Sequence, residues 1–243
     1  MYLCIDVGNS RTKATVFDDQ GLGLETIVFA GTSIEPIIAL HNLHYVKHVI
    51  VATTGDRQWD LTSLSFEGLG ISLSPDTPLP IEIVYSTPHT LGEDRIAGAC
   101  GAHAAFPGKN CMIVSAGTCL TIDLINKHGI YLGGNISPGM AMRLQSMHDY
   151  TAKLPLTEPA WPRLPFGDST VHALQNGACL GMVMEIRGML NQAENVLGDV
   201  FVVMTGGNAA FLADRLESEI FVAPELVTQG LFQILEFNVR KHN

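Results

Sequence analysis

The first residues of the chain alternate short apolar runs with polar turns, as strands of a sheet do. Met1–Val7 is apolar, Gly8–Arg11 is a polar turn, and Thr12–Asp18 is a second apolar run. Two such runs joined by a short turn predict a β-hairpin. A further run at Gly23–Phe29 predicts a third strand that extends the same sheet.

Helical and extended patterns alternate in the next stretch. Ser33–Leu43 has apolar residues at helical spacing, and Val46–Thr53 is a β-branched run that predicts a strand. Ser72–Pro80 is rich in serine and proline and predicts a loop, after which Ile81–Tyr85 returns to a strand pattern. The small residues of Asp94–Phe106 predict a closely packed helix.

The opening pattern recurs in the middle of the chain. Cys111–Ala116 is apolar, Gly117–Thr118 is a turn, and Cys119–Ile125 is a β-rich run. Tyr131–Ile136 predicts a third strand, so the order of elements repeats that of the first residues. The recurrence predicts two halves that are built on one plan.

The rest of the chain predicts a long helix, a strand and two further helices. Residues 149–168 are rich in proline and predict a loop, and Asp168–Thr170 caps the long helix that follows. This helix carries apolar residues at every fourth position, namely 174, 178, 182, 186 and 190. The later elements are a strand at Val200–Met204 and helices at Ala210–Glu217 and Glu225–Arg240.

These elements predict two α/β domains with mixed sheets, at residues 1–113 and 114–243. The order of elements is not the strict strand–helix alternation of a Rossmann fold. Apolar residues make up 47% of the 243 residues and charged residues only 16%, which is enough apolar material for a buried core. Long disordered stretches are therefore not expected.

Charge and cysteine content exclude several classes of protein. The net charge of −10 disfavours binding to nucleic acid through its phosphates. No run approaches the roughly 18 apolar residues of a membrane span, and the first residues lack the pattern of a signal peptide. The five cysteines show no CxxC pair, so we expect buried, reduced thiols. We expect a cytoplasmic protein that binds neither nucleic acid nor membrane.

The turn between the first two predicted strands has the composition of a phosphate-binding loop. Gly8 lets backbone N–H groups approach an anion, and Ser10 and Lys13 add a hydroxyl and an ammonium group. Asp6, at the end of the first strand, can hold the magnesium of a nucleotide through water. The alternative is an ordinary hairpin turn with a solvated lysine.

Two further glycine turns follow predicted strands. They are Gly117–Thr118 and Thr205–Asn208, and each alone is an ordinary connection. Three such turns at strand ends, in this order, fit a cleft that holds ATP between two domains.

A carboxylate and a guanidinium group stand side by side at Gly92–Arg95. Phosphoryl transfer needs an acceptor for the proton of the attacking hydroxyl, and Asp94 suits that role. Arg95 suits an anionic group of the substrate or the transferred phosphoryl group. The alternative is an acid that complements the helix dipole, beside a surface arginine.

Two other features have both a functional and a structural interpretation. Gly133–Gly139 borders a substrate pocket or is a plain strand–helix connection. Thr170 points its hydroxyl at substrate or is only a helix cap.

Four motifs together resemble those of the type III pantothenate kinases, a family of the actin-like kinase superfamily. The motifs are Asp-Val-Gly-Asn-Ser-x-x-Lys at 6–13, Gly-x-Asp-Arg at 92–95, Gly-Thr-x-x-Thr-x-Asp at 117–123 and Gly-Gly-x-Ile-x-Pro-Gly at 133–139. The first and third are shared with the wider superfamily, whereas the second and fourth are more specific to this family. The resemblance spans nearly the whole chain.

The resemblance implies a duplicated actin-like (ribonuclease H-like) fold with an ATP cleft between the domains, and a homodimer. It implies ATP-dependent phosphorylation of pantothenate to 4'-phosphopantothenate, the first step of coenzyme A synthesis, with ATP and Mg²⁺. By motif position, Asp94 would be the general base and Asp6 would hold magnesium through water. The ATP-binding residues would be Asp6, Val7, Gly8, Asn9, Ser10, Arg11, Thr12, Lys13 and Thr118. The pantothenate-binding residues would be Tyr85, Gly92, Glu93, Asp94, Arg95 and Thr170.

One residue departs from the family pattern. Ser115 stands where the family usually has an aspartate that helps to bind a potassium or ammonium ion. A serine hydroxyl carries no charge, so we expect this monovalent-cation site to be weakened or lost.

Two alternative functions stay open. One is an actin-like kinase that acts on another small hydroxyl substrate, and the other is a non-catalytic ATP-binding regulatory protein. The presence of Asp6, Lys13, Asp94 and Arg95 favours a catalyst over a regulator, and the net charge disfavours contact with DNA.

Overall fold

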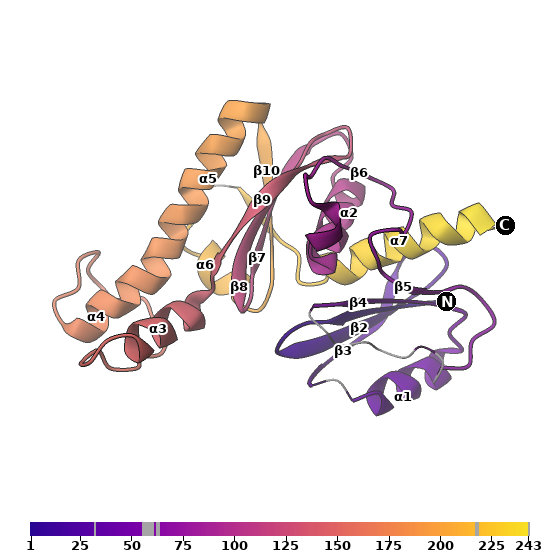
Figure 1. Cartoon of the computed structure of the whole chain (residues 1–243), viewed down its shortest axis with the longest axis horizontal. Helices are drawn as coiled ribbons and strands as arrows, with labels where there is room; N and C mark the ends of the chain where they lie inside the picture. The colour runs from indigo at the N-terminus through magenta and orange to yellow at the C-terminus, as the bar shows by residue number, and fades with distance from the viewer. Residues whose placement is uncertain (32, 55–60, 62–63, 217–218, 243) are drawn as a thin grey trace. The chain divides into compact units, whose positions relative to one another are not determined.

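The computed structural model describes residues 1–31, 33–54, 61, 64–216 and 219–242 (Figure 1). The chain forms two compact units, neither of which is continuous in sequence. The first unit contains Met1–Gly108, Lys127–Leu132 and Glu225–Asn243, and the second contains Lys109–Asn126 and Gly133–Pro224. The first unit thus includes residues that the sequence assigned to the second domain. The division at 113/114 stays a prediction.

A five-stranded mixed sheet forms the centre of the first unit. Its order is β3-β2-β1-β4-β5. β1 is antiparallel to β2 and parallel to β4, while β2 is antiparallel to β3 and β4 is parallel to β5. The strands are β1 (Tyr2–Val7), β2 (Arg11–Phe17), β3 (Gly23–Ala30), β4 (His48–Thr53) and β5 (Gly70–Ser72).

Side chains of β1 alternate between the two faces of this sheet. Leu3, Ile5 and Val7 enter a core that also holds Ile37 and Leu40 of α1 (Glu35–His44). Tyr2 lies on the other face and contacts the ring of Phe232 from α7 (Leu226–His242), with ring centroids 5.2 Å apart. A helix therefore covers each face of the sheet, and residues on the Tyr2 face lie under α7.

α7 also packs closely against α2 (Glu93–Ala105), beside which it lies in Figure 1. Two glycines allow this approach. A Cβ atom added at Gly230 would lie 1.7 Å from the carbonyl oxygen of Ala97, and one added at Gly101 would lie 2.4 Å from that of Leu226. No side chain larger than hydrogen fits at this crossing.

The sheet of the second unit repeats the topology of the first. Its order is β11-β10-β7-β8-β9, with β7 antiparallel to β8 and parallel to β10, and β10 parallel to β11. Its strands are β7 (Asn110–Ala116), β8 (Cys119–Ile125), β9 (Ile130–Pro138), β10 (Val200–Thr205) and β11 (Ile220–Val222). The second sheet also carries β6 next to β9. Apart from that strand, each sheet, numbered within its own unit, has the order 3-2-1-4-5. The predicted duplication is therefore confirmed.

One short strand and two short helices connect the longer elements. β6 (Glu82–Ile83) pairs in parallel with Ile130 and Tyr131 at the start of β9, within the first unit. The two short helices are η2 (Pro88–Thr90) and α6 (Ala209–Ala213).

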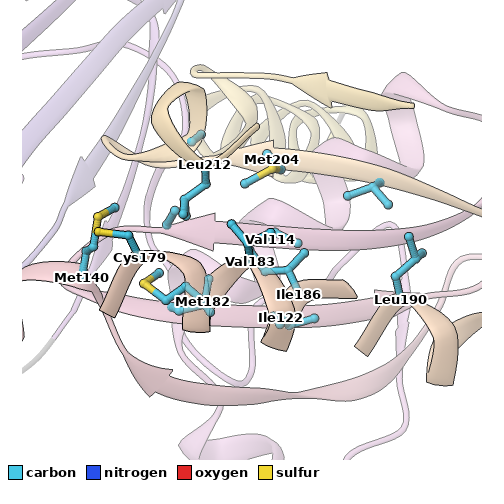
Figure 2. Close-up of a cluster of buried hydrophobic side chains, with 14 of the residues drawn as sticks. Val114, Ile122, Met140, Cys179, Met182, Val183, Ile186, Leu190, Met204 and Leu212 are labelled. Atoms are coloured by element: carbon cyan, nitrogen blue, oxygen red, sulfur yellow. The ribbon is translucent and has the colours of Figure 1, made fainter. Parts of the chain in front are cut away.

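The long helix of the second unit places its apolar face as the sequence predicts. It consists of α4 (Thr170–Gln175), a π-helical turn η3 (Asn176–Leu180) and α5 (Gly181–Leu197), and α3 (Met140–Asp149) packs near its start. Residues 174, 178, 182, 186 and 190 are all buried. Figure 2 shows Met182 and Ile186 beside Val114 and Ile122 of the sheet.

The sequence did not predict β5, β11 or the π-helical turn. β5 and β11 have three residues each and end their sheets, so they are too short to show alternation. α6 is shorter than the helix predicted at Ala210–Glu217, and Glu217 lies outside the described residues.

Four of the five cysteines are buried, and all five are free thiols, as expected. Burial raises the pKa of the Cys111 thiol to about 11 and raises that of Cys100 further. Within the described part of the chain, no helix is long and apolar enough to cross a membrane.

The α2–α7 crossing gives a test of packing. Gly230→Ala should lower the free energy of unfolding by about 1–3 kcal/mol, because the new methyl group overlaps the backbone of α2. Gly188→Ala is the matched control, since a Cβ there meets no atom within 4 Å, and it should stabilise α5 by up to about 1 kcal/mol. Urea denaturation of both variants measures the difference. Equal stabilities would contradict the close crossing.

Candidate active site

The β1–β2 turn is closed by its own backbone and presents polar residues to solvent. The N–H of Gly8 donates to the carbonyl of Arg11 at 3.0 Å, and Asn9 and Ser10 are exposed. Asp6 and Lys13 are directly opposite each other on β1 and β2. Neighbours across two strands share one face of the sheet. The turn therefore places a carboxylate and an ammonium group beside exposed polar residues.

Two residues that the resemblance assigned to ATP binding have side chains in the interior. Val7 is fully buried in the core, and the buried Thr12 donates its hydroxyl hydrogen to the carbonyl of Gly31 at 2.6 Å. Any contact of these two residues with a nucleotide would therefore be made by the backbone.

Asp6 carries a strongly perturbed carboxyl group. Burial, with the nearby negative charge of Asp94 as a smaller cause, raises its pKa to about 7, against an opposing effect of Lys13. A divalent cation would relieve this excess of negative charge, so the residues fit magnesium. No cluster of three or more His, Cys, Asp and Glu side chains occurs among the described residues.

Gly92–Arg95 forms the first turn of α2, and Gly92 is its N-cap residue. The backbone N–H of Arg95 donates to Oδ1 of Asp94 at 2.9 Å. A Cβ atom added at Gly92 would lie 2.7 Å from the same oxygen. The absence of a side chain at Gly92 therefore makes room for the Asp94 carboxylate.

Glu93 and Arg95 are both held within the first unit. The backbone N–H of Thr53, at the end of β4, donates to Oε2 of Glu93 at 2.6 Å, and burial raises the pKa of Glu93. Arg95 is only 7% exposed. The alternative of a surface arginine at this position is therefore wrong.

Tyr85 follows β6 in the same unit and is partly buried. Its ring lies edge-on to that of Tyr131, with centroids 6.2 Å apart. This contact fixes the ring, while its role toward substrate stays a prediction.

In the second unit, two glycine motifs meet at the Gly117–Thr118 turn. Gly139 donates its N–H to the carbonyl of Thr118 at 3.0 Å, and a Cβ atom there would lie 2.3 Å from the carbonyl oxygen of Gly117. Gly206 has a positive φ of 92°, and a Cβ atom would lie 2.6 Å from the carbonyl oxygen of Ala116. Glycine at both positions lets the backbone close on this turn.

Thr170 is exposed and is the first residue of α4. The cap of that helix is Ser169, whose hydroxyl accepts a hydrogen bond from the N–H of His172 at 3.2 Å. Thr170 is therefore not the cap, and its hydroxyl points out of the unit's core.

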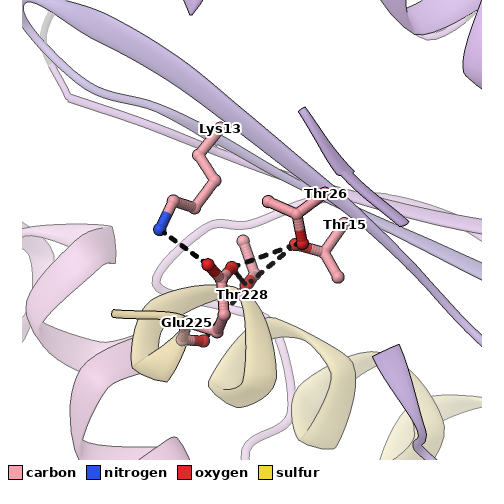
Figure 3. A network of polar contacts seen from close by, with 5 residues as sticks. All are labelled: Lys13, Thr15, Thr26, Glu225 and Thr228. Carbon is pink, nitrogen blue, oxygen red and sulfur yellow. Dashed lines mark hydrogen bonds and ion pairs between the residues drawn. The ribbon is translucent and has the colours of Figure 1, made fainter. Parts of the chain in front are cut away.

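The sequence did not indicate a site role for one residue, Glu225, which it predicted only as the start of a helix. Glu225 precedes α7, and its Oε1 accepts a hydrogen bond from Nζ of Lys13 at 3.2 Å (Figure 3). The two residues are 212 positions apart. The sequence shows only an acidic residue at the start of the helix predicted at Glu225–Arg240, and this position does not indicate Lys13 as its partner.

The chain is similar to known proteins over most of its length. A model of the type III pantothenate kinase family matches residues 2–192. Type III pantothenate kinases of Flavobacterium johnsoniae and Bacteroides fragilis are each 37% identical to this chain, over 243 and 241 residues. The first alignment covers 98% of this chain and 99% of the relative, and the second covers 98% of each.

The chain belongs to the type III pantothenate kinase family.

Solved structures confirm an actin-like fold. A Campylobacter jejuni protein that carries the name of a Baf family transcriptional activator is 22% identical, with a TM-score of 0.65 over 97% of this chain and 98% of its own. The activator of 2-hydroxyisocaproyl-CoA dehydratase from Clostridium difficile, solved with bound ADPNP, is 12% identical, with a TM-score of 0.59 over 99% of this chain and 96% of its own. At these identities the likeness concerns the fold alone.

The raised pKa of Asp6 predicts a pH-dependent effect on stability in protein freed of metal. The folded state binds the Asp6 proton more tightly than the unfolded state, so stability is lost as pH rises from about 4 to about 7. Asp6→Asn removes the buried charge and should raise the free energy of unfolding at pH 8 by up to about 4 kcal/mol. Denaturation in EDTA at pH 8 and pH 5 measures this gain. A gain of the same size at both pH values would contradict the predicted cause.

Proposed function

We propose that this chain transfers the γ-phosphoryl group of ATP to pantothenate, giving 4'-phosphopantothenate and ADP in the first step of coenzyme A synthesis. Membership of the type III pantothenate kinase family supports the reaction. The placement of Asp94 beside Asp6 is the observation that carries the mechanism. Thr53 pairs with Val7, the residue after Asp6, and its N–H holds Glu93, the residue before Asp94, at 2.6 Å. The charge of Asp94 contributes to the raised pKa of Asp6.

In this mechanism Asp94 accepts the proton of the substrate hydroxyl. The hydroxyl oxygen forms a bond to the γ-phosphorus, and the bond from that phosphorus to the β–γ bridging oxygen breaks, so ADP leaves with the electron pair. The room at Gly92 sets where the carboxylate of Asp94 lies. Magnesium, when bound, neutralises charge on the phosphates.

The binding residues follow the motif positions. We propose that pantothenate contacts Tyr85, Thr170 and the Gly92–Arg95 turn, with the guanidinium of Arg95 toward an anionic group. We propose that ATP is bound by residues 6–13 and Thr118, with Asp6 holding Mg²⁺ through water. The exposure of Asn9 and Ser10 in the β1–β2 turn and the close packing of glycines around Thr118 support these roles.

The assembly and location of the protein are also proposals. We propose a homodimer that acts in the cytoplasm, as the resemblance implies. Light scattering of the purified protein would give its mass, and a monomer at working concentration would contradict the dimer.

The decisive assay is release of ADP from MgATP in the presence of pantothenate. Asp94→Asn should lower kcat by about 10²- to 10⁴-fold, because no group accepts the proton, while binding of ATP is preserved. Asp76→Asn makes the same change at an exposed loop residue and should leave the rate unaltered. An active Asp94→Asn enzyme would exclude Asp94 as the base. ADP release that does not depend on pantothenate would contradict pantothenate as the substrate.

Ser115 predicts how the rate depends on monovalent cations. With no carboxylate at this position, rates in sodium and potassium buffers should agree. Ser115→Asp should introduce activation by potassium, because it restores the charge that the family uses. The same coupled assay in the two buffers tests both statements. A strong potassium requirement of the unaltered chain would mean that other ligands hold the ion.

A further inference from the structure

Glu225 is fixed in place by several contacts from different elements. The backbone N–H of Gln229 donates to its carbonyl at 2.9 Å, so Glu225 begins the hydrogen bonding of α7. Its carboxylate accepts hydrogen bonds from Nζ of Lys13 at 3.2 Å and from the hydroxyls of Thr15 and Thr228, each at 3.3 Å (Figure 3). A helix N-terminus also favours a negative charge there.

The sheet explains why these groups meet. Lys13 and Thr15 are two residues apart on β2, so both side chains leave the same face, and α7 covers that face. Thr15 is tied further to the hydroxyl of Thr26 on β3 at 2.9 Å. The side chain of Lys13 is 22% exposed and that of Glu225 is 36% exposed. The ion pair is therefore ordered and still open to a ligand.

The charges around Lys13 have a consequence for anion binding. Its ammonium group forms an ion pair with Glu225, and its charge also acts on Asp6, which lies opposite Lys13 on β1. A carboxylate 3.2 Å away cancels much of the attraction that the ammonium group would exert on phosphate oxygens. A nucleotide phosphate that contacts Lys13 must therefore bind its ammonium group together with Glu225, or displace the Glu225 carboxylate from it.

We propose that Glu225 is a positioning residue for Lys13 that competes with the phosphates of ATP and ADP for the same ammonium group. It holds Lys13 at the phosphate turn before nucleotide binds, and its charge lowers the affinity for both nucleotides. ADP then leaves more readily after transfer. This inference rests on the proposed role of residues 6–13 in binding ATP.

The test is direct binding of MgADP, measured by calorimetry without pantothenate. Glu225→Gln keeps the size and an acceptor oxygen but removes the charge, so the Kd for MgADP should fall by about 2- to 5-fold, as expected for a partly exposed ion pair. The KM for ATP should fall with it, while the KM for pantothenate stays the same. The gain should shrink as salt is raised, because salt screens the charge.

Two controls separate competition for Lys13 from other effects of the substitution. Glu236→Gln makes the same charge change on the same helix, about 16 Å further along its axis, where Glu236 pairs with Arg240 at 2.6 Å. It should leave the Kd unchanged. The second control repeats both substitutions in a Lys13→Gln variant. There, Glu225→Gln should lower the Kd for MgADP no more than Glu236→Gln does.

The outcomes are distinct for this inference and for the proposed function. An unchanged or higher Kd in Glu225→Gln, with normal binding by the unaltered chain, overturns the inference whether or not pantothenate is phosphorylated. Tighter binding by Glu225→Gln, without turnover of pantothenate, supports the inference while the proposed substrate fails. If Glu225→Gln does not fold, Glu225→Asp withdraws the carboxylate by one methylene and should lower the Kd in the same direction. An unchanged Kd in that variant overturns the inference.

Discussion

The pairing of β1 with β2 on one side and with β4 on the other is the constraint on which the first unit depends. Antiparallel pairing with β2 brings Asp6 opposite Lys13, and parallel pairing with β4 brings Thr53 to the same end of the sheet. The N–H of Thr53 then holds Glu93 in the first turn of α2. The next residue along the helix is Asp94. A single central strand thus aligns the β1–β2 turn with the start of α2, which carries the proposed base.

The carboxylate of Asp6 lowers the stability of the first unit, and neighbouring groups offset part of this effect. The carboxyl group of Asp6 is destabilised by burial and by Asp94, so the folded chain holds its proton up to about pH 7. Lys13 offsets part of this repulsion, and the helix terminus and hydroxyls at Glu225 offset the charge of a second acid. Acids whose charges repel each other lower the stability of the folded state, a cost that is common at functional sites.

The second unit uses the same sheet topology for a different local purpose. Its β7–β8 turn corresponds to the β1–β2 turn, but it carries no lysine and is enclosed by Gly139 and Gly206. Close backbone packing fixes the carbonyl groups on either side of Thr118. In one unit charged side chains flank the turn, and in the other the turn is enclosed by backbone that only glycine allows to approach.

The amino-acid sequence by itself determined the strands of both hairpins and the third strand beside each, because alternating apolar runs and glycine turns are local signals. It also determined the buried face of the long helix at residues 174–190 and the motifs that indicated the family. Tertiary structure alone decided the three-residue edge strands β5 and β11, which gain their hydrogen bonds from neighbours rather than from their own pattern. It alone placed residues 225–243 in the first unit and Glu225 beside Lys13. A contact between residues 212 positions apart depends on how sheet and helix pack, and no local pattern records it.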